Sequence, residues 1–555
     1  MRRGVLVVAC VAGMVCVAPM GGAAAAPAPA EASAGAVGAA GAAAIIADPL
    51  VDFNGDGFAD LAVGVPGEDA NNGAGDTGGV SVIYGSAGGL SATATPDQFW
   101  TQDSPNVEGT AEANDDFGSA VASGDFNADG FTDLAIGVPG EDASATTDGG
   151  VNVIHGSAGG LSATATADQF WGQDSPGVED TAEDYDEFGS ALAAGDFNLD
   201  GFADLAVGVH YEDASAGNTG GVNVIHGSAA GLSATVLADQ FWTQDSPNVE
   251  GTAETNDYFG LALAAGDFNA DGRSDLAVGV PYEDAAVGAT NDGGVSVIYG
   301  AVGGLSATAT PDQFWTQDSP NIEDTAEDND EFGWALAVGD FGGSNIADLA
   351  IGVPYEDLGA SGSPGAVSVI YGSPGGLLAT ATPDQFWTQD SPDVEGTAEP
   401  GDQFGFSLAV ANFGGSWPHA DLAIGVRYDG GGATSAGAVS VIYGSSAGLS
   451  ATATPDQLWT QDSPDVEGTA GAWDGFGSAL TIGDFNADFR SDLAIGVPSE
   501  DAPHTSDGGV NVIYGSLAAL SATTTPDQFW GQDTPNVEDA AEASDYFGRE
   551  LAAAS

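Results

Sequence analysis

The sequence predicts an all-β fold, a seven-bladed β-propeller of four-stranded blades. A nine-residue pattern, Asp-x-Asn-x-Asp-Gly-x-x-Asp, recurs every 71 to 73 residues. Each repeat holds four short apolar runs separated by Gly, Pro, Asp and Asn, which is typical of strands and turns. No long window keeps a helical period with caps. Seven such units close into a ring with only short, protected strand edges. The pattern starts at Asp52, Asp125, Asp196, Asp267, Asp340, Asn412 and Asp484.

The repeat that begins at Phe188 shows the expected order of strands. Residues 188–195 are mostly small, residues 205–209 and 222–227 are apolar, and residues 239–243 carry an aromatic pair. Small side chains suit the first strand, because seven such strands converge on the axis. We expect the Phe-Trp pair of the fourth strand to pack between adjacent blades. A ring of sugar-stacking platforms is the alternative interpretation.

Closure of the ring is predicted from the two ends of the repeat array. A Phe-Gly dipeptide opens the first strand seven times, the last time at Phe547, and none precedes Asp52. The first repeat therefore needs a strand from elsewhere, and the C-terminal strand after Phe547 is expected to supply it. The segment 45–51 competes for the same position, and the sequence leaves this choice open.

The N-terminal residues predict export. Residues 1–30 read as a signal peptide with its cleavage region, because Arg2 and Arg3 precede an apolar run of residues 5–18 and an Ala-rich stretch. Residues 31–44 read as a flexible Ala/Gly linker, and residues 45–555 as the propeller. Both cysteines, Cys10 and Cys16, lie in the signal. We expect a secreted protein with no disulfide and no membrane insertion.

The charge balance excludes whole classes of partner. The chain has 82 acidic residues, six Lys or Arg, and a net charge of −76. Such a surface repels nucleic acid and anionic membranes, and it favours a monomer. Two explanations stay open: an acidic solvated shell suited to high salt, or a surface for cationic partners.

The repeated loop predicts calcium. Calcium takes six to eight oxygens at about 2.3–2.6 Å and prefers carboxylates and carbonyls. Side chains at positions 1, 3 and 5 converge, position 7 offers its backbone carbonyl, and Asp at position 9 completes the site. Gly at position 6 permits the left-handed turn. The candidate ligands are Asp52, Asn54, Asp56, Phe58 and Asp60; Asp125, Asn127, Asp129, Phe131 and Asp133; Asp196, Asn198, Asp200, Phe202 and Asp204; Asp267, Asn269, Asp271, Arg273 and Asp275; and Asp484, Asn486, Asp488, Arg490 and Asp492.

The loops are not equivalent. Loop seven has Phe489 where Gly is wanted, so weaker binding is expected. Loop five lacks oxygens at position 3 and offers only Ser344 at position 5; loop six starts with Asn412 and is longer. Loops five and six are expected to hold no calcium, which leaves about four to five ions. A single match is also explained as an ordinary turn capped by Asp and Asn. Five copies in phase argue against that explanation, because clustered carboxylates destabilise one another without a cation.

These motifs resemble the FG-GAP repeats of integrin alpha subunits. The resemblance rests on Phe117-Gly118, on the calcium loop, and on Leu-Ala-Ile-Gly-Val-Pro at residues 134–139. It implies a calcium-stabilised seven-bladed propeller, often extracellular and engaged in adhesion or recognition. His210 and Arg427 replace the Pro in the third and sixth repeats. Similar repeats accompany a catalytic domain in glycosylphosphatidylinositol-specific phospholipase D, but the repeats fill this sequence and we expect no such domain.

Three functions compete. The favoured one is a secreted calcium-binding propeller that recognises an extracellular protein or glycan. The alternatives are a calcium-dependent lectin and, less favoured, a carboxylate-based hydrolase. His155 and His226 stand where other repeats have Tyr and are interpreted as packing variants; no nucleophile elbow or His-Glu-x-x-His motif occurs. We therefore expect no enzymatic activity and name no catalytic residue.

Overall fold

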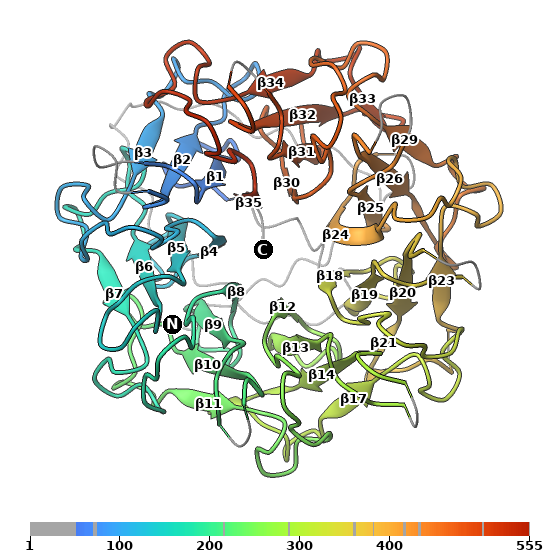
Figure 1. The fold of residues 1–555 in the computed structure, drawn as a ribbon, viewed down its shortest axis with the longest axis horizontal. Helices are drawn as coiled ribbons and strands as arrows, with labels where there is room; N and C mark the ends of the chain where they lie inside the picture. Colours follow the sequence, from blue (N-terminus) through green and yellow to red (C-terminus); the bar gives the residue numbers. More distant parts are fainter. Residues whose placement is uncertain are drawn as a thin grey trace, which may run out of the picture. The chain divides into compact units, whose positions relative to one another are not determined.

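The computed structural model describes residues 51–69, 75–214, 217–286, 289–358, 362–380, 382–414, 418–430, 435–501 and 504–553. The predicted signal peptide (1–30), linker (31–44) and residues 45–50 lie outside these ranges, and so do their predicted boundaries. Within the described ranges the protein contains strands and turns but no helix. Figure 1 shows the strands arranged as seven blades around a centre, in the order of the sequence.

Each blade is an antiparallel sheet of four strands, which follow one another from the innermost to the outermost. Blade one contains β35 (Glu550–Ala552), β1 (Leu61–Val65), β2 (Gly79–Ile83) and β3 (Gln98–Trp100). Blade two contains β4 (Ala120–Gly124), β5 (Asp133–Val138), β6 (Gly150–Ile154) and β7 (Gln169–Trp171). Blade three contains β8 (Ala191–Gly195), β9 (Asp204–Val209), β10 (Gly221–Ile225) and β11 (Gln240–Trp242). Blade four contains β12 (Ala262–Gly266), β13 (Asp275–Val280), β14 (Gly294–Ile298) and β17 (Gln313–Trp315).

The remaining blades follow the same plan. Blade five contains β18 (Ala335–Gly339), β19 (Asp348–Val353), β20 (Ala366–Ile370) and β23 (Gln385–Trp387). Blade six contains β24 (Phe404–Ala411), β25 (Asp421–Val426), β26 (Ala438–Ile442) and β29 (Gln457–Trp459). Blade seven contains β30 (Leu480–Gly483), β31 (Asp492–Val497), β32 (Gly509–Gly515) and β34 (Gln528–Trp530), with β33 (Leu520–Ser521) pairing the end of β32. Short hairpins join β15 (Gly300–Ala301) to β16 (Gly304–Leu305), β21 (Gly372–Ser373) to β22 (Gly376–Leu377), and β27 (Gly444–Ser445) to β28 (Gly448–Leu449).

The C-terminal strand closes the ring, which confirms one of the two expected arrangements. β35 pairs antiparallel with β1 in the register Ala62↔Ala552, Val63↔Leu551 and Gly64↔Glu550. The first blade is thus built from both ends of the described chain (Figure 1). Polar contacts repeat across this junction as across the others: the outer-strand Gln98 Nε2 donates to the Leu161 carbonyl, and Gln528 Nε2 donates to the Leu90 carbonyl.

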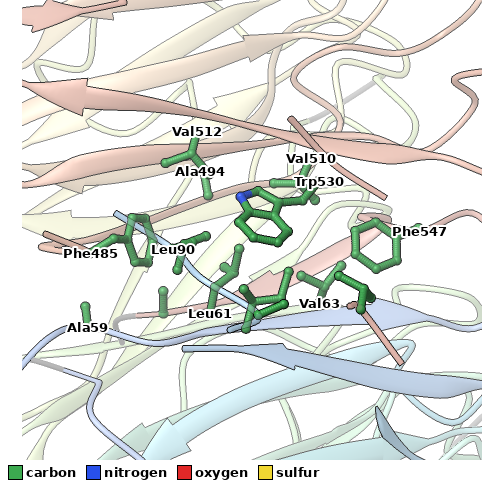
Figure 2. Packing of buried hydrophobic residues seen from close by; sticks show 14 of the residues in the cluster. Ala59, Leu61, Val63, Leu90, Phe485, Ala494, Val510, Val512, Trp530 and Phe547 are labelled. Carbon is green, nitrogen blue, oxygen red and sulfur yellow. The ribbon is translucent and has the colours of Figure 1, made fainter. Parts of the chain in front are cut away.

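The core consists of clusters that lie between neighbouring blades. Figure 2 shows the cluster between blades one and seven, where Leu61 and Val63 pack against Val510, Val512 and Trp530. Second and third strands are buried on both faces, which explains their continuous runs of Val, Ile, Leu and Ala. The Trp of the outer strand packs in such clusters, as predicted. Burial of these side chains is the main force that holds adjacent blades together.

The blade order defines two faces. The loop face carries the nine-residue loops that lead into the second strand of each blade, together with the links from third to fourth strands. The opposite face carries the links from second to third strands and from each outer strand to the next innermost strand. The candidate calcium loops and the acidic loops between strands therefore lie on different sides of the ring.

Candidate functional site

The ninth-position aspartate of the loop is buried in every blade. In loop one, Asp60 accepts hydrogen bonds from the Phe53 N–H (2.9 Å) and from the Gly85 N–H (3.0 Å) that follows β2. The same pair of bonds fastens the loop in the other blades, at Asp133, Asp204, Asp275, Asp348, Asp421 and Asp492. Burial raises the pKa of Asp60 to about 8. Because blades five and six share this arrangement, the ninth carboxylate has a structural role in all seven loops.

The first-position aspartate shapes the turn. Asp52 Oδ1 accepts from the N–H groups of Gly55 (2.6 Å) and Asp56 (3.1 Å), and its Oδ2 accepts from the Gly57 N–H (2.7 Å). Gly57 lies at a φ of 90°, in the left-handed region that the sequence predicts for position 6. Equivalent bonds to the first position recur at Asp125, Asp196, Asp267 and Asp484.

Loop five forms the same turn without the full set of candidate ligands. Asp340 accepts hydrogen bonds from the Ser344 N–H and the Asn345 N–H, both at 2.7 Å. Asn345 takes the left-handed position with a φ of 60°. Position 3 of this loop is Gly342, so the turn does not need the Asn that stands there in other loops.

The fifth position caps the turn in loops one to four, and the third position does so in loops one and two. In loop one, Asn54 Oδ1 accepts from the Asp56 N–H (2.9 Å), and Asp56 Oδ1 accepts from the Phe58 N–H (3.1 Å). Loop two repeats both bonds at Asn127 and Asp129. Loops one and two therefore each gather two carboxylates and one carboxamide in one turn, beside the buried ninth carboxylate. In loops three and four the Asn Nδ2 donates to the ninth Asp instead. Oxygens of this kind are the ligands that calcium takes.

In loops four and seven, an arginine side chain lies beside the fifth-position aspartate, which is a candidate calcium ligand. Arg273 Nη1 lies 3.4 Å from Asp271 Oδ1, and Arg490 Nη1 lies 3.0 Å from Asp488 Oδ2. The sequence suggested only the backbone carbonyls of these two residues as ligands. In loop seven, Phe489 occupies the left-handed position at a φ of 65° with its side chain 96% exposed.

Two buried histidines contact the ninth-position aspartates of loops two and three. His155 Nδ1 lies 3.1 Å from Asp133 Oδ2, and His226 Nδ1 lies 3.2 Å from Asp204 Oδ2. Both imidazoles are buried, so their interpretation as packing residues is incomplete. A signal existed in the sequence, because only the second and third repeats replace the Tyr of this position by His.

The opposite face carries a belt of buried carboxylates. A Gln that follows each outer strand donates its Nε2 to an acidic side chain of the next blade, for example Gln173 to Glu212 (2.8 Å) and Gln317 to Glu356 (2.8 Å). The belt crosses the ring junction through Gln532 and Glu68 (2.8 Å). Its other members are Gln102 with Glu141, Gln244 with Glu283, Gln389 with Asp429 and Gln461 with Glu500.

Some of these carboxyl groups lie against further acids. Burial, reinforced by neighbouring carboxylates, raises the pKa of Glu68 and Glu212 to about 9 and that of Glu356 to about 8. Ligand atoms of three acidic residues lie within 4.8 Å of one another in four groups, none of which includes a predicted loop residue. The groups are Glu68, Glu542 and Asp545; Glu183, Asp186 and Glu212; Glu254, Asp257 and Glu283; and Glu327, Glu356 and Asp357.

Aromatic side chains form an arc on the same face, in blades three to seven. Tyr258 packs edge-on against Tyr211 and Tyr282, with ring centroids 5.2 and 5.1 Å away. Trp334 packs against Tyr355 and Phe406, both at 5.7 Å. The arc continues through Arg427, whose guanidinium lies 4.4 Å from the Phe406 ring, to Tyr428 and Trp473.

The aromatic arc went unnoticed in the sequence, although a signal was present. Tyr follows the end of the second strand in the four middle repeats, at Tyr211, Tyr282, Tyr355 and Tyr428. The other three repeats have Gly or Ser at this position.

Within the described ranges, no helix has the length and apolar character needed to cross a bilayer.

Comparison with known proteins identifies the repeats. The family model described as FG-GAP repeat matches six segments, residues 48–83, 117–154, 188–225, 259–298, 332–370 and 476–514. The unmatched sixth repeat is the one whose loop begins with Asn412 and is longer. Among solved structures, one titled "Structure of Dos1 propeller" aligns at 11% identity with a TM-score of 0.35, covering 83% of this chain and 80% of that chain. A likeness of that strength carries no argument.

Curated relatives match parts of the propeller. The chain is 33% identical to human phosphatidylinositol-glycan-specific phospholipase D over 196 residues, which is 34% of this chain and 21% of that protein. It is 31% identical to integrin alpha-PS2 of Drosophila melanogaster over 243 residues, 43% of this chain and 15% of that protein. It is 30% identical to integrin alpha-5 of Xenopus laevis over 202 residues, 35% and 16% of the two chains. The matched regions thus span about a fifth or less of these relatives. The repeats, the relatives and the seven blades together make this chain an FG-GAP repeat protein with a propeller like that of integrin alpha subunits.

Proposed function

We propose that this protein is a secreted calcium-binding propeller that acts as a recognition or adhesion module. Calcium would stabilise loops one to four and seven, and the opposite face would meet the partner. One observation carries the calcium part of the proposal. Loop five folds into the same turn with Gly342 and Ser344 at positions 3 and 5.

The comparison with loop five removes the simplest alternative. If Asn54 only capped a turn, loop five would need an equivalent, and it forms the turn with Gly342 there. At position 5, Ser344 Oγ keeps the cap by accepting from the Ile346 N–H (3.2 Å), so a carboxylate is not needed for the turn. Two carboxylates in one loop, above a buried third, destabilise one another's ionised forms within about 4–6 Å. A divalent cation reverses that effect, and carboxylate, carboxamide and carbonyl oxygens are the ligand set of calcium.

The test is a count of bound calcium in single variants. Asp129→Ala in loop two and Asp200→Ala in loop three should each lose one ion while the propeller stays folded. Ser344→Ala, at the same position of loop five, is the matched control and should lose none. Equilibrium dialysis with metal analysis gives the count, and circular dichroism checks the fold. Fewer than three ions on the wild-type protein, or no loss in either Asp variant, would refute the loop assignment.

Calcium should also raise the thermal midpoint. A ligand bound only by the folded state stabilises it by about 2.7 kcal/mol per site at a hundredfold excess over Kd. The midpoint of the wild-type protein should therefore rise between micromolar and millimolar calcium, and by less in Asp129→Ala.

Export is expected from residues 1–30, and the mass of the secreted chain would locate the cleavage point.

The aromatic arc supports the recognition part of the proposal. Aromatic side chains are enriched where proteins bind partners. The rings of the arc are partly exposed, Trp473 is exposed, and the same face carries many carboxylates. An extracellular protein with a basic contact region fits this surface. Binding of such a partner should fall in Trp334→Ala and Tyr282→Ala and persist in Ser344→Ala. Equal binding by all three variants would move the recognition site elsewhere.

A lectin is the second candidate, because one pocket favours it. Trp473 is 58% exposed and packs edge-on against Tyr428 at 5.5 Å. Glu399 and Asp402 line the same pocket, whose volume is about 460 Å³. An aromatic platform beside carboxylates suits a sugar ring. Glycan-array binding that disappears in Trp473→Ala would establish this function; a hydrolase would instead require turnover of a glycoside or ester by the purified protein.

A further inference from the structure

The acidic belt of the opposite face differs between blades at one position. The segment that leads from an outer strand into the next blade reads Glu-Gly in four cases, and the glycines Gly109, Gly251, Gly396 and Gly468 have φ between 111° and 119°. The segments that lead into blades one, three and five have Asp there, and these residues keep a positive φ. Asp539 lies at 86°, Asp180 at 85° and Asp324 at 99°. Glycine adopts this conformation at the lowest cost, so the turn itself does not explain the aspartates.

Each of these aspartates lies against the buried glutamate of the blade that its segment enters. Side-chain hydrogen-bond contacts join Asp539 to Glu68, Asp180 to Glu212, and Asp324 to Glu356. Together with the groups of three acids on this face, each of the three blades gathers at least four carboxyl groups. The glutamates are no more than 3% exposed.

A buried carboxamide from the neighbouring blade completes each group. Gln532 Nε2 donates both to Glu68 and to Asp539 Oδ2 (3.1 Å), which places its amide among the carboxyl groups. Gln173 and Gln317 donate to Glu212 and Glu356, both at 2.8 Å. These three glutamines are 1–2% exposed, and their Oε1 atoms, like those of the other four glutamines of the belt, are buried without a hydrogen-bond partner among the described residues.

A buried amide oxygen without a partner is unfavourable and calls for an explanation. Half a turn about the last side-chain bond exchanges the oxygen and nitrogen of a carboxamide without changing its shape. The oxygen would then face the carboxylates, which is unfavourable unless a cation lies between them. Several carboxylates and one amide oxygen form the ligand set of a hard divalent cation.

Within the described ranges, no arginine is paired with these groups. Of the four arginines in the described ranges, Arg273 and Arg490 pair with aspartates of the loop face, and Arg427 stacks on Phe406. Arg549 interacts with Asp116 and Glu550. Buried carboxylates are costly unless they are paired, protonated or bound to a metal.

We propose that blades one, three and five each bind a hard divalent cation, by its ligand chemistry calcium, on the face opposite the nine-residue loops. The side chains that hold it are Glu68, Asp539, Glu542, Asp545 and Gln532 in blade one; Glu212, Asp180, Glu183, Asp186 and Gln173 in blade three; and Glu356, Asp324, Glu327, Asp357 and Gln317 in blade five. These sites are additional to the loop sites and do not depend on them.

The decisive variant replaces the three aspartates by the residue that the sibling blades use. The triple variant Asp180→Gly, Asp324→Gly, Asp539→Gly should bind three fewer calcium ions than the wild-type protein in equilibrium dialysis. The measurement uses about 1 M NaCl, where a Debye length of ~3 Å suppresses diffuse counter-ions. Failure of the loop assignment would leave this difference of three unchanged, so the two proposals are tested separately.

The difference in thermal midpoint between the triple variant and the wild-type protein should change sign with calcium. In chelator the triple variant should melt no lower than the wild-type protein, because glycine relieves both the repulsion and the left-handed strain. At millimolar calcium the wild-type protein should melt higher. Shared protons instead of cations would leave the ion count equal in the two proteins, and an equal count would overturn the proposal.

A gain-of-site variant completes the test. In blade four, Glu254, Asp257 and Glu283 already lie together beside Gln244, and Gly251 stands where the other three blades have Asp. Gly251→Asp should therefore bind one more calcium ion than the wild-type protein. Gly88→Asp, at an exposed glycine of the loop face, is the matched control and should add none. No added ion in Gly251→Asp, or the same addition in both variants, would count against the proposal.

Discussion

Blade five holds acidic groups at both of its ends, and the two ends treat them differently. On the loop face, Asp340 and Asp348 each accept two backbone N–H hydrogen bonds. On the opposite face, Glu356 accepts a hydrogen bond from Gln317 and contacts Asp324. Backbone amides solvate a carboxylate permanently, because the fold itself fixes them. A neighbouring acid stabilises a carboxylate only when a proton or a cation lies between the two groups.

This difference separates two reasons for an acidic residue. The loop-face aspartates are explained in part by the turn that they stabilise, which is why loop five still forms. On the opposite face, Glu356 accepts one backbone N–H bond, from Leu358 (3.1 Å), and burial together with neighbouring carboxylates raises its pKa to about 8. In blade five, whose loop is expected to hold no calcium, the carboxylate of Asp340 is therefore solvated by the backbone, whereas the acids around Glu356 should respond to pH and to cations.

Removal of a ninth-position aspartate should have the largest effect. Asp348→Ala leaves the N–H groups of Phe341 and Gly372 buried without an acceptor, at about 1–3 kcal/mol each. We expect a loss of about 2–6 kcal/mol in the free energy of unfolding, measured by urea denaturation. Since loop five is expected to hold no calcium, the loss should be equal in chelator and in calcium. Asp348→Asn keeps one acceptor and should lose about half as much. A loss seen only in calcium would place a metal in loop five.

Glu331, on the opposite face, should contribute to the pH dependence of stability. Burial raises the pKa of Glu331 from 4.5 to about 7, and its Oε2 is buried without a hydrogen-bond partner among the described residues. A raised carboxyl pKa means that the folded state binds the proton more tightly. Its contribution is therefore full below pH 4.5 and is lost as the pH rises through 7. The protein should become less stable across that window in chelator.

The variant Glu331→Gln isolates this contribution. It should flatten the fall in the free energy of unfolding between pH 4.5 and 7, by up to about 3 kcal/mol if the site were dry and by less where water screens it. Asp533→Asn removes an equal charge from an exposed position of the same face and serves as the control. If both variants flatten the curve equally, net charge and not burial governs the pH response.

The fold was predictable because every level of the sequence agrees with it. The period fixes the number of blades, and the unpaired Phe547-Gly548 at the end indicates one of the two segments that could close the ring. The choice between residues 45–51 and the C-terminal strand required the structure, since both segments are long enough to pair. The pairing of Ala552 with Ala62 decides it.

The site was predictable only within one loop. Periodicity states which residues occupy the same position in each blade, so Asp52 and its equivalents were found together. It does not state which position of one blade meets which position of the next, because that depends on blade tilt and strand twist. The contact of Gln532 with Glu68 and the stacking of Tyr258 on Tyr282 therefore appeared only in the structure. The sequence also did not show the direction of side chains. It predicted Arg273 only as a backbone carbonyl ligand, whereas in the structure its guanidinium lies beside Asp271.

The smallest expected effect concerns that arginine and sharpens the comparison of the two faces. Arg273 Nη1 lies 3.4 Å from Asp271 Oδ1, so on the loop face a protein cation already occupies part of the space that an ion would take. Loops one to three have Phe at this position. The ion pair is partly exposed and is worth about 0.2–1 kcal/mol. Arg273→Phe should therefore tighten calcium binding at loop four by up to about fivefold, since 1.4 kcal/mol corresponds to a factor of ten.

The reverse exchange in loop two is the matched control. Phe131→Arg should weaken calcium binding there by a similar factor and leave the number of bound ions unchanged, because arginine screens the ligands without removing any of them. Calorimetric titration measures both changes. Opposite shifts in the two loops would show that a single cationic side chain tunes the affinity of a repeated site. Shifts of the same sign would instead attribute the change to packing of the seventh position, since Phe and Arg differ in shape as well as in charge.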